Sequence, residues 1–443
     1  MKKIFCIMLA CAFIFTALAG CGAGTDKTAS TTAAVTEAPA ATTQAAATDK
    51  PAEEITLVTS RWAGPNADDQ AEILKEFTKE TGIQVKQDAI DYGQLHQKQV
   101  LNMSSATGEY DLIYAQEIWV PEYVNAGYLK PLDEYAANKE LAGPDFSLDN
   151  YIQAFLKIDT MNGKLYAIPT FAQADVFAYN KDMLKEIGIE PHDNWTWDEV
   201  LSASEKFKAK GTGIALPFKQ GLAIAEVFLT FARSNGGDYF NSEGKLDLAK
   251  PENIEAAEYI KKLSANSLKG STGWHYDEVN KAVQFGQAPM GITISGLCNA
   301  LEDPANSKVS GKIGYAPLPY KKDPKGLISL WSWVIPNSSK HPEEAFKLLA
   351  WLTSAKIEKA QSLKNGQISA QQSLFNDSEL VQKSPWLPAM KTIFDNGSTA
   401  PLDSNASKLS EGVSVALSAI VTGKEDPKAV LEKAQNDLKS LYP

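Results

Sequence analysis

Aromatic side chains follow several apolar runs of the sequence, and such positions suit the binding of a sugar. The chain has nine tryptophans. Trp62 and Trp119 each follow a run that reads as a strand, Phe171 follows another, and Trp274 lies in a Gly-Trp-His-Tyr segment. In open α/β sheets, ligands bind beyond the carboxyl ends of the strands. A flat ring there can cover the apolar CH face of a sugar, while amides and carboxylates hydrogen-bond its hydroxyl groups.

Each of these rings has an alternative place in the hydrophobic core. For Trp62, Trp119 and Trp331 the sequence leaves both interpretations open. Trp333 shares one face of an expected strand with Trp331, and a core position is favoured for it. Core positions are also expected for Trp195, Trp197, Trp351 and Trp386.

Signals of catalysis are poor by comparison. The segment 412–416, Gly-Val-Ser-Val-Ala, is close to a nucleophile elbow but lacks the final glycine and reads as helical. His96, His192, His275 and His341 are scattered, without the spacing of metal ligands. A glycosidase needs two facing carboxylates. The sequence marks no such pair, but it leaves that alternative open.

The first residues read as an export signal. Lys2 and Lys3 precede an apolar run at 4–18 that is too short for a membrane span. The run ends in Leu-Ala-Gly-Cys at 18–21, which resembles the bacterial lipobox. We therefore expect a lipoprotein signal peptide at 1–20 and a lipid on Cys21, followed by a disordered Ala/Thr-rich tether to residue 53.

The net charge excludes some classes of partner, and the cysteine count excludes an intramolecular disulfide in the mature chain. Removing residues 1–20 takes away two lysines and no acid, so the formal charge moves from −11 to −13. Such an acidic chain argues against nucleic acid and against an anionic membrane surface as partners. Cys6 and Cys11 leave with the signal and Cys21 carries lipid, so Cys298 remains alone. It is expected to be a small buried hydrophobe.

Beyond residue 54, strand-like and helix-like segments alternate, which predicts parallel βαβ units in an α/β fold. About 390 residues are enough for two lobes. Strands are expected at 55–58, 83–90, 111–114, 213–218, 290–294 and 313–316. Helices are expected at 68–80, 94–103 and 223–234, and others begin at the 196–199 capping box, at Pro342 and at Pro427.

Motifs spread over 54–443 resemble those of extracellular solute-binding protein family 1, the group that contains maltose-binding-type proteins. In chain order they are FTKETGIQV at 77–85, GEYDLI at 108–113, AGYLKPL at 126–132, GKLYAIP at 163–169, AYNKDML at 178–184, WTWDE at 195–199 and GYAPLP at 314–319.

The resemblance implies a periplasmic-binding-protein-like fold of type II. Two α/β lobes are then joined by hinge crossovers, with a ligand cleft between them. Residues 54–170 and 316–355 would form lobe 1, and residues 171–315 and 356–443 would form lobe 2. One crossing is expected from Pro169 to Asp175, between two strand-like runs.

By the same likeness, the cleft receives two kinds of side chain. Trp62 and Trp331 would stack on the ligand, while polar groups would bond its hydroxyls. Many relatives carry a tryptophan after the glycine that corresponds to Gly296, where Leu297 and Cys298 stand here, so that one stacking platform is either missing or supplied by Trp274 or Trp331. The full set of expected ligand-binding residues is Arg61, Trp62, Gln116, Glu117, Trp119, Phe171, Gln173, Asp175, Trp274, Asn299 and Trp331.

The sequence therefore indicates a monomeric substrate-binding lipoprotein of an ABC importer, anchored by lipid on the extracytoplasmic face of the cell membrane. It would capture a mono- or oligosaccharide or a polyol by lobe closure and deliver it to permease subunits. No cofactor, metal or catalytic residue is expected. Two alternatives remain: a surface glycoside hydrolase, or the same fold binding a peptide, polyamine or metal chelate. An anionic ligand would favour Arg61, and a cation Glu117 and Asp175.

Overall fold

The computed structural model describes residues 55–423 and 425–443. The predicted signal peptide at 1–20, the predicted lipid site at Cys21 and the tether to residue 53 lie outside the described residues. Among the helices of the described ranges, none combines the length and the hydropathy that crossing a lipid bilayer requires.

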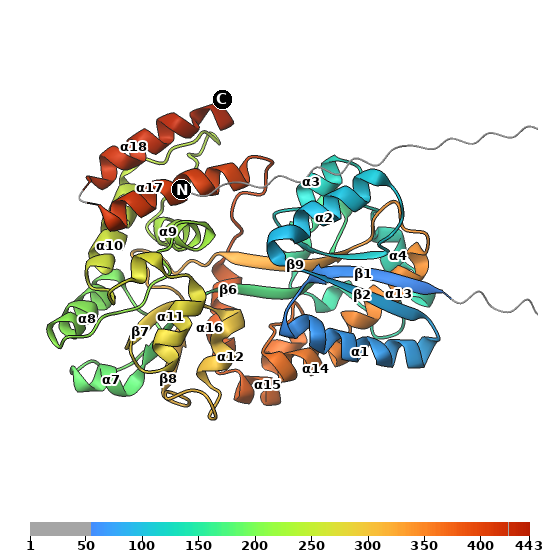
Figure 1. The fold of residues 1–443 in the computed structure, drawn as a ribbon, viewed down its shortest axis with the longest axis horizontal. Helices are drawn as coiled ribbons and strands as arrows, with labels where there is room; N and C mark the ends of the chain where they lie inside the picture. Colours follow the sequence, from blue (N-terminus) through green and yellow to red (C-terminus); the bar gives the residue numbers. More distant parts are fainter. Residues whose placement is uncertain (1–54, 424) are drawn as a thin grey trace, which may run out of the picture. The chain divides into compact units, whose positions relative to one another are not determined.

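A seven-stranded mixed sheet organises the fold (Figure 1). Its order is β2-β1-β3-β9-β6-β7, and β8 also pairs with β6. The pairs β1–β2 and β1–β3 are parallel, whereas β9 is antiparallel to both β3 and β6. The strands are β1 (Thr56–Trp62), β2 (Gln84–Ile90), β3 (Leu112–Gln116), β6 (Ile168–Asn180), β7 (Met290–Ile294), β8 (Ile313–Ala316) and β9 (Ile328–Val334), with β4 (Thr160–Met161) and β5 (Lys164–Leu165) forming a separate hairpin.

Strand β6 links two sets of strands. Its first half pairs with β9 as far as Ala174, and its second half pairs with β7 from Asp175 onward. The sequence predicted a crossing at this place between two strand-like runs. In the structure the two runs form one continuous strand of 13 residues, because β9, β7 and β8 provide ladder partners along its length. The crossing between lobes stays a prediction.

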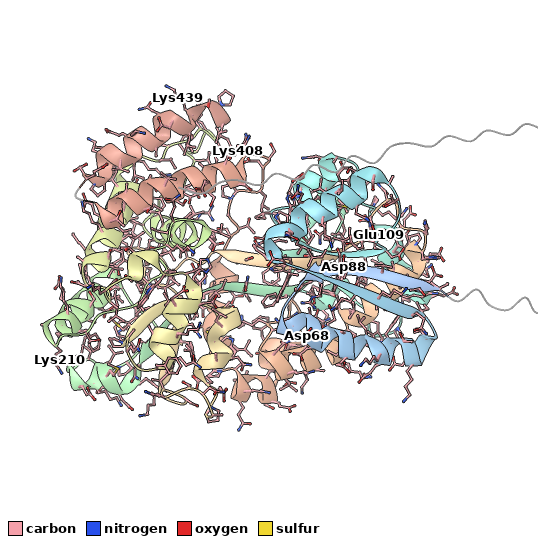
Figure 2. The ribbon with its side chains drawn as sticks, viewed as in Figure 1. Asp68, Asp88, Glu109, Lys210, Lys408 and Lys439 are labelled. Atoms are coloured by element: carbon pink, nitrogen blue, oxygen red, sulfur yellow. The ribbon has the colours of Figure 1, made fainter. Side chains whose placement is uncertain are left out.

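Helices surround this sheet, and several begin or end where the sequence predicted. Thr196 and Glu199 form the capping box of α8: the Thr196 N–H donates to Glu199 Oε2 at 2.8 Å, and the Glu199 N–H donates to Thr196 Oγ1 at 3.4 Å. Gly82, with φ of 78°, ends α1. Figure 2 shows Asp68 on α1, where its negative charge in the first turn suits the helix dipole.

The helices differ widely in length. The longer ones are α1 (Pro65–Thr81), α2 (Tyr92–Ser105), α8 (Trp197–Ala209), α9 (Leu222–Ser234), α10 (Pro251–Ala265), α11 (Tyr276–Gln284), α13 (Pro342–Leu352), α14 (Ala355–Asn365), α16 (Leu387–Asn396), α17 (Ala406–Thr422) and α18 (Pro427–Leu438). The shorter ones are α3 (Val120–Asn125), α4 (Asp133–Ala137), α5 (Lys139–Ala142), α6 (Gln153–Ile158), α7 (Lys181–Glu186), α12 (Cys298–Leu301) and α15 (Ser378–Lys383), with 3-10 turns η1 (Leu148–Asn150), η2 (Ser271–Gly273), η3 (Ser295–Leu297), η4 (Gln372–Asn376) and η5 (Lys439–Leu441).

The strand expected at 213–218 does not form. Ile214 makes an isolated bridge with Ser267 and Ala215 makes one with Gly291, but no ladder extends from them. Pro217 has no N–H to donate, and that limits any ladder through this segment. The six residues are buried nonetheless, so their apolar run reflects burial and not strand pairing.

Two clusters of buried apolar side chains form the core. The first contains Leu57, Ile113 and Leu348 together with segments as distant as Val279 and Ile393. The second is built on α8, α9, α10, α17 and α18. Because side chains alternate along a strand, β6 contributes Val176 to the first cluster and Phe177 to the second. These clusters do not coincide with the predicted lobe boundaries, which stay a prediction.

Candidate functional site

Three neighbouring strands bring predicted site residues into one row. Trp331 on β9 pairs with Gln116 on β3 and with Phe171 on β6. Two residues along β9, Ser329 pairs with Gln173. Residues directly opposite each other, or two apart on one strand, share a face of the sheet. The sheet therefore presents an indole, a phenyl ring and two amides side by side.

The polar residues after β3 are held by hydrogen bonds within the protein. Gln116 accepts from the Tyr92 hydroxyl at 2.8 Å, and its Nε2 donates to Ser329 Oγ at 3.2 Å. The Glu117 carboxylate accepts from the Leu330 N–H at 2.8 Å. These bonds fix both side chains in one orientation and tie the end of β3 to β9.

Trp331 is the centre of an aromatic group. The centroids of its neighbours lie 5.1 Å away for Tyr114, 5.5 Å for Trp119, 6.0 Å for Trp62 and 6.1 Å for Tyr92. Trp331 is only 4% exposed and Trp119 8%, whereas Tyr92 is 49% exposed and Trp62 is half-buried. The group thus has buried rings at its base and accessible rings at its edge.

A cavity of about 290 Å³ opens beside Tyr92 and Trp119. That volume is near the lower end of the range for small-molecule sites, roughly 300–1,000 Å³. Segments far apart in the sequence meet here, because α2 and the turn before α3 face α9 and α17. Figure 1 shows α9 and α17 side by side. The lining residues are Tyr92, Ile118, Trp119, Leu222, Ala225, Glu226, Leu229, Tyr239, Leu327, Ala400, Pro401, Ala406, Ser407, Ser410 and Glu411.

A larger cavity of about 380 Å³ lies elsewhere, among Tyr179, Asp193, Trp195 and Tyr315. None of the predicted site residues lines it. We therefore place the candidate site at the smaller cavity, where the aromatic group of Trp331 reaches the surface.

Two acids from different elements meet near this cavity. The Tyr276 hydroxyl on α11 donates to Glu226 Oε2 on α9 at 3.2 Å. Asp175 on β6 is 5% exposed and also faces Tyr276. Burial raises the pKa of Asp175 to about 7. Burial, followed by the nearby charges of Asp175 and Glu117, raises the pKa of Glu226 well above its ordinary value.

Glu117 is a third buried acid of this region. Burial raises its pKa to about 8, against the opposing effect of the Leu330 N–H that bonds the charged form. Three acids with raised pKa values thus lie in this region, and Glu226 is the one that lines the cavity.

Arg61 lies underneath the aromatic group instead of facing the cavity. Its guanidinium carbon is 5.1 Å from the Trp62 ring centroid and 5.0 Å from that of Tyr114, and its Nη1 donates to Gln70 Oε1. Burial lowers the pKa of Arg61 to about 10. The contacts indicate that Arg61 supports Trp62 by a cation–π interaction.

The segment at 295–299 lies beside β6. A Cβ at Gly296 would be 3.1 Å from Gln173 Oε1 and 3.7 Å from Phe171 Cζ, so backbone approaches both side chains closely. Asn299 packs against Gly366. Cys298 is fully buried with its Sγ 3.9 Å from the Ile294 carbonyl oxygen, which confirms it as a buried core residue.

Trp274 stands apart from the row on β3, β9 and β6. It follows η2 and packs beside Gly270, and its carbonyl accepts from the Lys219 N–H at 2.9 Å. The predicted core tryptophans Trp195, Trp197, Trp333 and Trp386 are all at most 3% exposed, and Trp351 is half-buried.

The sequence did not single out Tyr92, Glu226, Tyr239 or Tyr276. One signal was available for Glu226: it is the sole acid of the strongly apolar helix α9. A lone carboxylate among such residues indicates either a paired group or a functional one. The tyrosines carried no comparable signal, because their neighbours come from other parts of the chain.

Comparisons with known proteins agree with this fold. The sequence profile of the bacterial extracellular solute-binding proteins matches residues 62–359. A probable amino-acid ABC transporter periplasmic-binding protein of Sinorhizobium fredii is 30% identical over 72% of this chain and 73% of its own length. The arabinooligosaccharide-binding protein of Bacillus subtilis is 28% identical over 63% of this chain and 65% of its own.

Two solved structures match nearly the whole described chain. A solute-binding protein from Agrobacterium radiobacter K84 in complex with ribitol has a TM-score of 0.77 and 25% identity, and covers 89% of this chain and 100% of that one. Maltose-bound MalE3 of T. maritima has the same TM-score at 22% identity, with 87% and 100% covered. They confirm the predicted α/β class, periplasmic-binding-protein-like type II. By profile and by fold, this chain belongs to the bacterial extracellular solute-binding proteins.

Proposed function

We propose that this protein captures a carbohydrate or polyol and delivers it to the permease of an ABC importer. The observation that carries the proposal is the row Gln116–Trp331–Phe171 beside the cavity at Tyr92 and Trp119. Rings and fixed amides along one face of the sheet suit a guest with apolar CH faces and many hydroxyls. Relatives named for an arabinooligosaccharide and for mannitol, and a structural neighbour with ribitol, support the same class.

Capture would work by lobe closure. In this proposal residues 54–170 and 316–355 form one lobe, residues 171–315 and 356–443 form the other, and the segment from Pro169 to Asp175 is one hinge. A ligand shifts the open–closed equilibrium only by its greater affinity for the closed form. Ligand-dependent compaction in X-ray scattering would support closure, and an unchanged radius of gyration under saturation would contradict it.

A thermal-shift screen on residues 22–443 tests the ligand class. Sugars, sugar alcohols, amino acids, peptides and metal ions are compared, because a ligand that binds only the folded state raises Tm by mass action. Amino acids are included since the Sinorhizobium fredii relative is named for them. A rise in Tm with sugars or polyols alone would support the proposal. A rise in Tm with another class alone would show that the ligand belongs to that class.

The protein would act without catalysis. The buried acids of the site have raised pKa values, which a glycosidase acid also needs, so turnover is worth a direct test. Chromatography after a day with glycans should recover them intact. Cleavage that Glu226→Gln abolishes would establish the hydrolase alternative.

We further propose that a lipid on Cys21 anchors the protein on the extracytoplasmic face of the membrane. The protein would act there as a monomer. One acyl chain holds a protein to the membrane only weakly, whereas two or more acyl chains give stable attachment. Cys21→Ala should move the protein from the membrane fraction to the soluble fraction. A variant that remains in the membrane fraction would show that the thiol is not the anchor.

A further inference from the structure

Carboxylates and aromatic rings together line the cavity beside Tyr92. Glu226 and Glu411 supply the carboxylates, and Tyr92, Trp119 and Tyr239 supply the rings. Neither lysine nor arginine is among the lining residues. Ring faces attract cations through their quadrupole, and the attraction grows when water is removed. The lining therefore favours a positively charged group over a neutral or negative one.

A buried acid next to Glu226 lacks a full set of partners. Asp175 Oδ2 is buried and has no hydrogen-bond partner among the described residues. Both Asp175 and Glu226 face the hydroxyl of Tyr276, which bonds Glu226 at 3.2 Å. One hydroxyl has one proton and cannot satisfy two carboxylates. A buried carboxyl oxygen without a partner costs free energy, and a hydrogen-bond donor on a ligand would recover it.

The charges around this pair are mostly negative or neutral. Tyr239 is fixed by donating its hydroxyl to the Ala225 carbonyl at 3.0 Å. Arg233 is a cation near Tyr239, but it is paired with Asp238 at 2.8 Å. The titratable or charged groups that face the pair or its cavity are Tyr92 on α2, Glu117 after β3, Asp175 on β6, Glu226 and Arg233 on α9, Tyr239 after α9, Tyr276 on α11 and Glu411 on α17.

We infer that the ligand of this site carries an ammonium group, held by Glu226 and the rings of Tyr92 and Trp119, with Asp175 as the second carboxylate. The inference rests on the proposed capture of a solute and narrows its class to one with a protonated amine. An amino sugar provides this chemistry, and so does an amino acid or a polyamine. The rings would cover the CH groups beside the nitrogen, and the carboxylates would accept from its N–H groups.

Proton release is the expected signature. In the empty protein burial raises the pKa of Asp175 to about 7 and that of Glu226 well above its ordinary value, which favours the protonated forms of the pair. A cationic ligand favours the charged carboxylates, so it expels up to about one proton per ligand at pH 7. Affinity should then rise with pH, by up to about tenfold per unit, below the pKa of the pair and as long as the amine of the ligand keeps its own proton.

The experiment is calorimetric titration of residues 22–443 with D-glucosamine, N-acetyl-D-glucosamine, D-glucose, spermidine and lysine. Each is measured in two buffers of different ionisation heat, at pH 6, 7 and 8. We expect glucosamine to bind at least about tenfold more tightly than its two neutral counterparts, with buffer-dependent heat. Equal binding of all three sugars would overturn the ammonium inference and leave the carbohydrate proposal standing.

The other outcomes separate the two proposals. Binding of spermidine or lysine with proton release, and of no sugar, would sustain the ammonium group and overturn carbohydrate as the guest. If none of the five probes binds, both the carbohydrate proposal and the ammonium inference are overturned for ligands of this size.

Substitutions of the two acids test where the ammonium group of the ligand binds. Glu226→Gln and Asp175→Asn keep the side-chain shape and remove the charge, so each should reduce the preference for glucosamine over glucose toward one and abolish proton release. Glu258→Gln, an exposed acid on α10, is the matched control and should change neither. Thermal unfolding reports whether each variant is folded. A folded Glu226→Gln that retains both the preference and the proton release would contradict the inference.

Discussion

The indole of Trp119 lies nearly perpendicular to that of Trp331, with centroids 5.5 Å apart and planes at 85°. Edge-to-face packing of this kind is the favoured arrangement of aromatic rings. Trp119 lines the cavity, whereas Trp331 is 4% exposed and packs behind it without lining the cavity. The two residues are 212 positions apart in the chain. Trp119 can contact a ligand in the cavity, and Trp331 supports Trp119 by packing against it.

The first prediction concerns this aromatic group. Trp62→Ala should weaken ligand binding by about 1–3 kcal/mol, by analogy with stacking of bases on aromatic side chains. Trp331 is too buried for a clean truncation, since removing a core tryptophan costs about 3–5 kcal/mol of stability. Trp331→Phe is therefore the better variant, and calorimetry with the ligand found in the screen is the measurement.

Trp351→Phe is the control for both substitutions, because Trp351 packs against Phe77 and donates to Glu80, away from the cavity. It should leave affinity unchanged. Unchanged affinity in both Trp62→Ala and Trp331→Phe would remove these rings from the binding site.

The second prediction concerns stability and pH. Burial raises the pKa of Glu117 to about 8 and those of Asp159 and Asp175 to about 7. At pH values between the ordinary pKa of each group and its raised pKa, the unfolded chain has released protons that the folded chain still holds. Stability is therefore highest at the acidic end of this window and falls as pH rises from about 5 to 8, by up to about 1.4 kcal/mol per unit for each group.

Urea unfolding at pH 5.5, 7 and 8 measures this slope. Glu117→Gln should flatten it, because the amide oxygen can still accept from the Leu330 N–H and no charge has to be buried. The matched exposed substitution Glu258→Gln should leave the slope as it is. A wild-type protein that gains stability between pH 5.5 and 8 would contradict the assignment.

The third prediction concerns the pairing of β6 and β8. Gly314 lies opposite Tyr179, and a Cβ at Gly314 would be 2.3 Å from the Tyr179 ring. Gly314→Ala should therefore destabilise the protein by about 1–3 kcal/mol through overpacking. Gly273→Ala is the matched control, because no atom lies within 4 Å of its added Cβ. Equal Tm values for the two variants would show that the strand can shift at little cost.

The fourth prediction concerns Cys298. It is fully buried, and burial raises the pKa of its thiol well above the ordinary value. In residues 22–443 it is the single cysteine. A thiol reagent should therefore label the folded protein far more slowly than the unfolded one. Fast labelling of the native protein, at the rate seen in urea, would place the thiol at an accessible surface.

Local chemistry was read correctly from the sequence. The capping box of Thr196 and Glu199, Gly82 after α1, and Pro342 and Pro427 at the starts of α13 and α18 all appear where predicted. Each depends on a few neighbouring residues, so a short window contains the whole interaction. The strand expected at 213–218 failed for the opposite reason, because a strand needs a distant partner that no short window contains.

The sequence by itself placed Trp62 and Trp119 after expected strands and Trp331 within one, and the family resemblance added Gln116 to the predicted site. The tertiary structure alone decided which of them reach the cavity and which support it from below. It also brought in Glu226 and Tyr276, which lie 50 positions apart and meet through one hydroxyl. The physical reason is that burial and pairing depend on long-range packing, whereas the apolar run that marks a strand is a local feature of the sequence.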